Sequence, residues 1–187
     1  MNKPKFNEVY KLNIISLILF LTCISECKLF TGEVKARESE GKSNIFSMNH
    51  TQLVYFSNKN EFTTKFTQLK SAIEPETENY IFKIIPQPDN TRSIMHIAQA
   101  KSKNIKSYIG LVYAIKRNGD DYTDAIGQLC EAQTPQSLSV TPEIPRLAED
   151  VFESKDIKCP SGFQSLNYTF SSKASEPIKY KKNGVAE

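Results

Sequence analysis

The sequence predicts an α+β domain in which one helix packs on a four-stranded antiparallel sheet. Two observations predict it. Apolar residues recur at helical spacing within residues 37–59, and four short runs rich in β-branched and aromatic residues follow, joined by turn-like segments. A single helix followed by strands with short connections favours an antiparallel sheet that the helix covers on one face.

Residues 37–59 carry apolar side chains along one helix face. The stripe consists of Ile45, Met48, Gln52, Tyr55 and Phe56. We expect Phe46, Leu53 and Val54 to widen the buried surface. Residues 58–60, Asn-Lys-Asn, predict the end of the helix, because asparagine tolerates the left-handed conformation found there.

The strand-like runs begin after a short turn or helix predicted over residues 62–69. They span residues 80–85, 94–98, 108–115 and 125–131. The segments between them contain Pro, Asn, Asp and Gly, which are typical of turns. The sequence therefore predicts four strands in chain order.

The composition indicates one globular domain. A chain of 187 residues with 39% hydrophobic and 24% charged residues has room for one domain of ordinary size. The 24 Lys and Arg residues against 21 Asp and Glu residues leave a formal charge of +3. That charge is too small to indicate nucleic-acid binding, so we expect no nucleic-acid partner.

The amino end has the features of an export signal. Lys3, Lys5 and Lys11 precede an apolar stretch over residues 12–24. Thirteen residues of helix reach about 20 Å, less than the bilayer core of about 30 Å. A basic flank before a short apolar run is typical of a secretory signal, and a short membrane anchor is the alternative. We expect an exported protein (periplasmic, outer-envelope-associated or extracellular) whose membrane contact is confined to this segment.

Two processing routes are compatible with this end of the chain. Cys23 and Cys27 lie where a lipoprotein carries its acylated cysteine, although the residues before them are not the small ones preferred there. Residues 34–36, Val-Lys-Ala, instead resemble a signal-peptidase site. The sequence therefore predicts that residues 1–36 form a signal peptide or a lipoprotein-type targeting segment.

Removal of this segment would leave two cysteines, Cys130 and Cys159. Two thiols in an oxidising compartment normally pair, and the 28 residues between them include three prolines and little apolar periodicity. A disulfide would hold such a segment in place, and two free buried cysteines are the alternative.

Six blocks of sequence resemble one known family. In chain order they are residues 44–56 (NIFSMNHTQLVYF), 62–69 (FTTKFTQL), 76–80 (ETENY), 106–114 (KSYIGLVYA), 129–135 (LCEAQTP) and 158–162 (KCPSG). Together they resemble the type IV pilin-like G and H proteins of cyanobacteria, which are similar to general-secretion pseudopilins. The resemblance implies a helix on an antiparallel sheet, closed by a carboxy-terminal loop that the Cys130–Cys159 disulfide bounds. The resemblance covers about residues 40–166, so we expect the pilin-like domain at residues 37–166, and the polar composition of the carboxyl end predicts a flexible tail at 167–187.

The amino end departs from the pattern of pilins. Gly32 and Glu33 follow the apolar run, whereas in pilins the processing glycine and a nearby glutamate accompany an apolar helix that comes after them. We therefore expect the fibre-forming segment of pilins to be missing, and the protein not to polymerise alone.

No constellation of catalytic residues is evident. Neither His50 nor His96 accompanies a nucleophile elbow, so we expect no enzyme activity and no cofactor. Asp120, Asp121 and Asp124 form an acidic turn that is a weak candidate for Ca²⁺, with a solvated turn as the alternative.

The resemblance implies an exported structural protein, accessory to a type IV pilus or a secretion-type machine, with protein partners. The alternative is a free or lipid-anchored extracytoplasmic module that binds a small ligand or calcium. Without the fibre-forming segment, we expect the contacts with a partner to come from the turn near Asp120 and from the disulfide-bounded loop, both projecting from the sheet.

Overall fold

The computed structural model describes the backbone of residues 7–69, 73–87, 92–116, 124–135, 138, 140–147 and 156–171, and within these ranges the side chains from residue 32 onwards except that of Thr169. The chain divides into two compact units, Met1–Arg37 and Glu38–Glu187. We call the second unit the head. The fold is described below for each unit by itself.

One helix, α1 (Asn7–Lys59), runs through the first unit into the head. It begins 30 residues before the start predicted at residue 37. Six of the 13 residues between the apolar run and the head are Glu, Lys, Ala or Arg, which are good helix formers, and α1 contains no proline. Within the part of the chain that the structure describes, no helix is both long and apolar enough to cross a membrane.

The end of α1 agrees with the predicted stop. Asn60 has a φ of 55°, and its backbone N–H donates to the carbonyl of Phe56 at 2.7 Å. Asparagine adopts this left-handed conformation more readily than most residues, so it can close the last turn. A single 3-10 turn, η1 (Phe66–Gln68), lies within the predicted segment 62–69.

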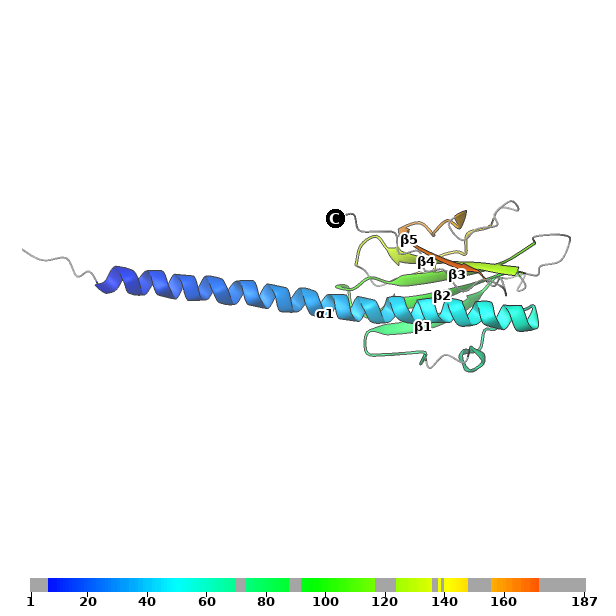
Figure 1. The fold of residues 1–187 in the computed structure, drawn as a ribbon, viewed down its shortest axis with the longest axis horizontal. Helices are drawn as coiled ribbons and strands as arrows, with labels where there is room; N and C mark the ends of the chain where they lie inside the picture. Colours follow the sequence, from blue (N-terminus) through cyan, green and yellow to red (C-terminus); the bar gives the residue numbers. More distant parts are fainter. Residues whose placement is uncertain are drawn as a thin grey trace, which may run out of the picture. The chain divides into compact units, whose positions relative to one another are not determined.

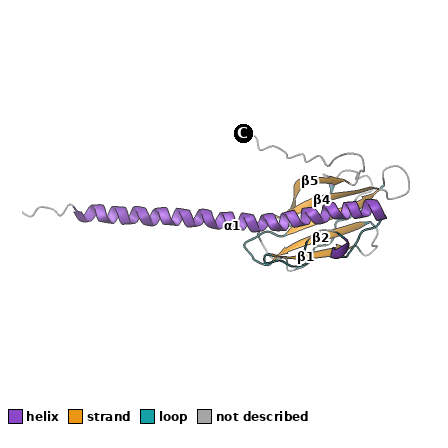
Figure 2. Ribbon diagram, turned by 60° about the horizontal axis from the view of Figure 1, so that its bottom comes forward, coloured by secondary structure: helices purple, strands orange, loops and turns teal. Residues whose placement is uncertain are grey.

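The sheet has five strands, not the four predicted. They are β1 (Tyr80–Pro86), β2 (Ser93–Ala100), β3 (Tyr108–Ile115), β4 (Asp124–Ala132) and β5 (Phe163–Ser171). They follow one another across the sheet in chain order, and each pairs antiparallel with its neighbour (Figures 1 and 2). The first four coincide with the predicted runs.

The strand that the sequence did not predict, β5, extends past the predicted domain boundary at residue 166. Residues 167–171 therefore belong to the sheet and not to the tail. Residues 172–187 lie outside the described residues. The pairing of β5 with β4 is interrupted between Gln128 and Cys130, and apolar and polar residues do not alternate along the whole of β5.

The head has three layers. In Figures 1 and 2 the part of α1 that belongs to the head runs along one face of the sheet. The opposite face is covered by the chain between β4 and β5, described at residues 133–135, 138, 140–147 and 156–162, which we call the covering segment. Every residue of β3 is buried, because β3 is central and covered on both faces.

The helix face toward the sheet is broader than the predicted stripe. Its fully or nearly fully buried members are Ile45, Met48, Asn49, Gln52, Leu53 and Phe56. Tyr55 is half-buried. The expectation that Val54 widens this surface is wrong, because 49% of Val54 is exposed. Position 54 points away from the sheet, about 100° around the helix from position 53.

Candidate functional site

A buried polar contact joins α1 to the middle of the sheet. The Oδ1 atom of Asn49 lies 2.8 Å from Nδ1 of His96 on β2, and Nδ2 of Asn49 donates to the backbone carbonyl of Gln128 on β4 at 3.1 Å. Because Nδ2 is the donor side of the amide, Oδ1 faces the ring, and His96 must donate from Nδ1. The neutral ring that results is fully buried, and burial lowers the pKa of His96 to about 3.

A glycine makes this contact sterically feasible. Gly110 on β3 stands opposite His96 in the strand register. A Cβ atom at position 110 would overlap the amide of Asn49 and approach Ile45. The absence of a side chain at Gly110 therefore lets α1 lie close enough to β2 and β4 for Asn49 to reach both.

A second contact fixes the first turn of α1 in the head. Gly41 lies against the ring of Tyr80, where any Cβ atom would collide with that ring, and the Tyr80 hydroxyl donates to the carbonyl of Lys106 at 3.0 Å. Glu38 accepts a hydrogen bond from the backbone N–H of Lys106 at 3.0 Å, and Glu40 accepts one from Asn79 at 2.7 Å. Burial, with Glu38 and Glu40 nearby, raises the pKa of Tyr80, so its hydroxyl stays protonated as a donor.

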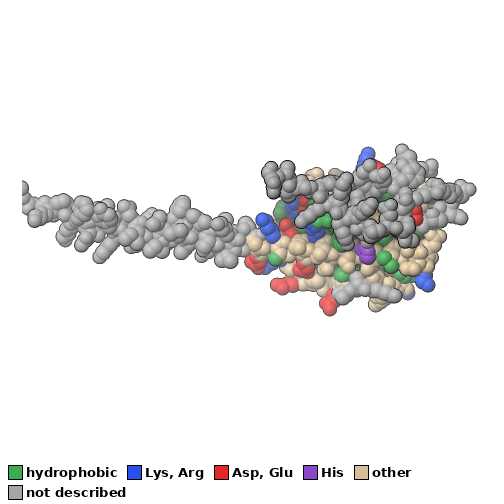
Figure 3. Space-filling model, viewed as in Figure 1, with side chains coloured by type: hydrophobic (Ala, Val, Ile, Leu, Met, Phe, Trp, Pro, Cys, Tyr) green, Lys and Arg blue, Asp and Glu red, His purple; other side chains and the backbone are tan. Residues whose placement is uncertain are grey.

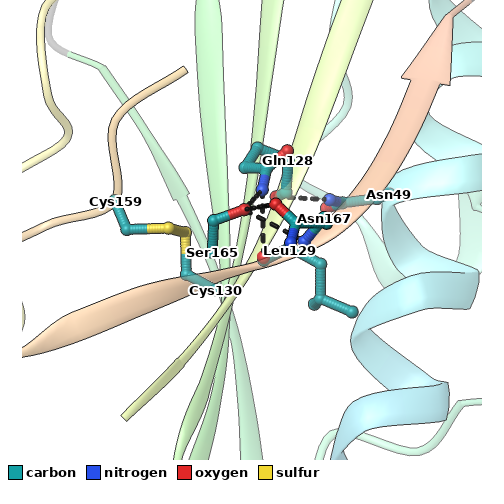
Figure 4. Close-up of a disulfide and its surroundings, with 7 residues drawn as sticks. All are labelled: Asn49, Gln128, Leu129, Cys130, Cys159, Ser165 and Asn167. Carbon is teal, nitrogen blue, oxygen red and sulfur yellow. Dashed lines mark hydrogen bonds between the residues drawn. A yellow bond between two sulfur atoms is a disulfide. The ribbon is translucent and has the colours of Figure 1, made fainter. Parts of the chain in front are cut away.

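The Cys130–Cys159 disulfide is confirmed, with a Cα–Cα distance of 5.9 Å. Cys130 is fully buried on the face of β4 that points away from α1. In Figure 4 the disulfide and Asn49 lie on opposite sides of β4. The bridge therefore ties the covering segment to the outer face of the sheet.

The covering segment packs onto the sheet, so the expectation that the disulfide-bounded loop projects from it is wrong for the described residues. Tyr113 donates from its hydroxyl to the carbonyl of Pro145 at 2.6 Å, and Gln99 donates to the carbonyl of Leu138 at 2.9 Å. The segment's apolar side chains pack against the buried outer-face cluster; they are Leu138, Ile144, Leu147 and Ile157. Its apolar residues are irregularly spaced, so no periodicity in the sequence predicts that this segment packs on the sheet.

Between Ser43 and Asn58 the exposed side of α1 carries no charged residue. From Ser43 to Asn58 the sequence contains no Lys, Arg, Asp or Glu, although these make up 24% of the chain. The exposed residues of this stretch are Ser43, Val54, Ser57 and Asn58, and the half-buried Asn44, Ser47, His50 and Thr51 accompany them. In Figure 3 most of the red and blue side chains lie toward one end of the head, a few lie at its other edges, and tan and green surface lies between them. We call the surface formed by these eight residues the uncharged helix face.

The weak calcium candidates are not brought together by the described structure. Asp120 and Asp121 lie outside the described residues, and Asp124 begins β4. Among the described residues, no three His, Cys, Asp or Glu side chains cluster as metal ligands would. Cys23 and Cys27 lie within α1, where side chains are not described, so lipidation stays a prediction.

A helix on one face of an antiparallel meander, with a disulfide near the carboxyl end of the sheet, defines a pilin-like head. The sequence model of the type IV pilin-like G and H family matches residues 38–160, more than half of the chain. The chain belongs to this family. Comparison of the chain with curated proteins and with solved structures finds no match.

Sequence reasoning missed Asn49 and Gly110 as determinants of the helix–sheet contact. Asn49 is polar, so it was not assigned to the apolar stripe, although its neighbours Ile45, Met48 and Gln52 place it on the same face. Gly110 was visible as a glycine inside a strand pattern, which is a known sign of close approach by another backbone or side chain.

Proposed function

We propose that this protein is an extracytoplasmic accessory subunit of a type IV pilus or a secretion-type pilin machine, and that it acts by binding other pilin-like subunits. Membership of the pilin-like family supports the class of assembly. The family match begins at residue 38, where the head begins, so the proposal concerns the head in the first place.

The observation that carries the proposal is the uncharged helix face. An exposed helix in water usually presents charged side chains on the face opposite its core. Ser43, Ser47 and Thr51 instead have small side chains, which let a neighbouring helix approach closely. The face is suited to the α1 helix of a neighbouring pilin-like subunit, because no lysine or carboxylate would be buried without a partner there.

The proposed mode of action is binding without catalysis. His96 is buried between α1 and β2 and is held by Asn49, so it supports the fold and has no access to a substrate. The amino-terminal departure from pilins favours an accessory subunit over a self-assembling one. In this proposal the protein enters assemblies that other subunits form.

A matched pair of substitutions tests the surface. Ser43→Lys places a charge on the uncharged helix face, and Ser161→Lys places the same charge on an exposed turn before β5. We expect Ser43→Lys to reduce recovery of the protein with sheared fibres at least tenfold, and Ser161→Lys to leave it unchanged. Equal melting temperatures would show that both heads are folded. Equal recovery of the two variants would contradict the proposed surface.

A further inference from the structure

Strand β5 is attached to the sheet in two separate sections. Near its start Phe163 pairs with Ala132, and near its end Ser171 pairs with Ile126. Between these sections three residues of β5, centred on Asn167, stand opposite Leu129 alone. Asn167 has a φ of 55°, which marks the centre of this bulge. The ladder of this edge strand is therefore interrupted at its midpoint.

Each section has its own anchor. The later section is held by Phe170, which is buried with its ring centroid 4.8 Å from that of Phe46 on α1. The earlier section follows Cys159 by only four residues, and Cys159 is bonded to Cys130 of β4. The disulfide is thus the covalent anchor for the first half of β5.

The register of the hairpin determines what this disulfide constrains. The covering segment connects Ala132 to Phe163, and these two residues are paired in the folded sheet. While β5 is docked, the ends of the covering segment are already held together, and the disulfide shortens that loop very little. Once β5 leaves, the disulfide is the covalent link that keeps the chain near β4, beside the contacts of the covering segment with the sheet. Its loop-closure effect therefore acts on the docking of β5.

We propose that β5 is a releasable edge strand and that the Cys130–Cys159 disulfide is its redox-sensitive catch. A dithiol reductant transfers two electrons to the bridge: the S–S bond breaks, two protons complete the Cys130 and Cys159 thiols, and the reductant becomes a disulfide. The section of β5 nearest Cys159 then loses its anchor and undocks first, and β5 as a whole is held only by the later section at Phe170. The remaining strands keep α1 on one face, because Asn49 bonds β2 and β4 and not β5.

Accessibility of the bridge agrees with this role. Cys130 is fully buried, but Cys159 is only half-buried and lies between the exposed Lys158 and the turn that leads into β5. An attacking thiolate needs to reach one sulfur only. Because Cys159 belongs to the covering segment, reduction starts from the surface and does not require the sheet to open first.

Hydrogen exchange of the full chain tests the proposal. We expect dithiothreitol to speed exchange of the β5 amides by about a hundredfold or more, while β2 and β3 keep their protection. Unchanged protection of β5 in the reduced protein would overturn the proposal. So would simultaneous loss of protection in every strand, since the bridge would then govern the whole fold.

A second cross-link separates docking of β5 from other effects of the bridge. The background for this test is a chain in which Cys23, Cys27, Cys130 and Cys159 are all changed to serine. Adding Glu131→Cys and Gln164→Cys to it supplies two thiols that can be oxidised to a disulfide, because these positions pair between β4 and β5. We expect this new bridge to restore the protection of β5. The control bridge, Ile81→Cys/Gln99→Cys, pairs β1 with β2 and is expected not to restore it. Restoration by both bridges, or by neither, would contradict the proposal.

Discussion

The Nδ1 atom of His96 donates to Oδ1 of Asn49 across 2.8 Å, and this bond joins α1 to β2 inside the head. The other ring nitrogen, Nε2, is buried and has no hydrogen-bond partner among the described residues. A second proton on the ring would therefore be buried as an uncompensated charge. The geometry thus makes the stability of the head depend on a neutral His96.

Acid should weaken the head through His96. The pKa of His96 is lowered from 6.5 to about 3, so the unfolded chain binds the proton more tightly. The stabilising effect of the neutral ring is complete above pH 6.5 and is lost as the pH falls toward 3, at about 1.4 kcal/mol per pH unit. Urea unfolding at several pH values should show about 3 kcal/mol lost between pH 6.5 and 4. If the free energy of unfolding fell as steeply with falling pH in His96→Gln as in the unsubstituted protein, this account would be contradicted. His50→Gln serves as the control and should keep the pH dependence.

Two glycine substitutions in α1 should have opposite effects. Gly41→Ala drives a Cβ atom into the ring of Tyr80, and we expect it to lower the free energy of unfolding by about 2 kcal/mol despite alanine's better helix propensity. At Gly32 a Cβ atom would meet nothing within 4 Å, so Gly32→Ala should not destabilise the protein. Thermal unfolding compares the two. Tolerance of Gly41→Ala would mean that Tyr80 is not packed as described.

Charges introduced on α1 should distinguish its buried and exposed sides. Met48→Asp or Phe56→Asp places a carboxylate in the core between α1 and the sheet, which costs several kcal/mol, a large share of the total stability of a domain. Val54→Asp and Lys59→Asp change exposed positions and should alter stability by about 0.5 kcal/mol or less. Circular dichroism reports the folded fraction. Unfolding by Val54→Asp as complete as that by Met48→Asp would rule out this orientation of α1.

The covering segment should loosen when its bond to β3 is removed. Tyr113→Phe deletes the hydroxyl that donates to the carbonyl of Pro145, and we expect a loss of about 1 kcal/mol together with faster hydrogen exchange at residues 144–147. Tyr55→Phe, which removes a hydroxyl at the surface near Glu61, is the control. Exchange that stays the same in Tyr113→Phe would show that apolar packing alone holds the segment.

Most of the head could be predicted from the sequence because its helix and first four strands have clear patterns of apolar and β-branched residues. The helix stripe and β1 to β4 follow from apolar spacing and β-branched runs, and the pairing of Cys130 with Cys159 followed from the cysteine count. The long start of α1 was missed because the basic flank and apolar run at the amino end predict a targeting segment over residues 1–36, whereas the structure has one helix from Asn7 to Lys59.

The missed features depend on contacts distant in sequence. β5 is an edge strand whose alternation is broken by its bulge, so only its pairing with β4 reveals it. The position of the covering segment depends on Tyr113 and Gln99, which reach it from strands far away in the chain. The uncharged helix face could have been found from the sequence, since it is an uninterrupted run without Lys, Arg, Asp or Glu, but its exposure comes from the structure.

The central claim is that this family member is an accessory subunit of a pilin-type assembly. The most direct test is to quantify the protein in sheared fibres and in the remaining fractions of the cells that produce it. The account predicts that the protein is recovered with the fibres as a minor component, and that the purified protein alone forms no filaments. Absence from the fibres would contradict the account, as would recovery of the protein as their main component.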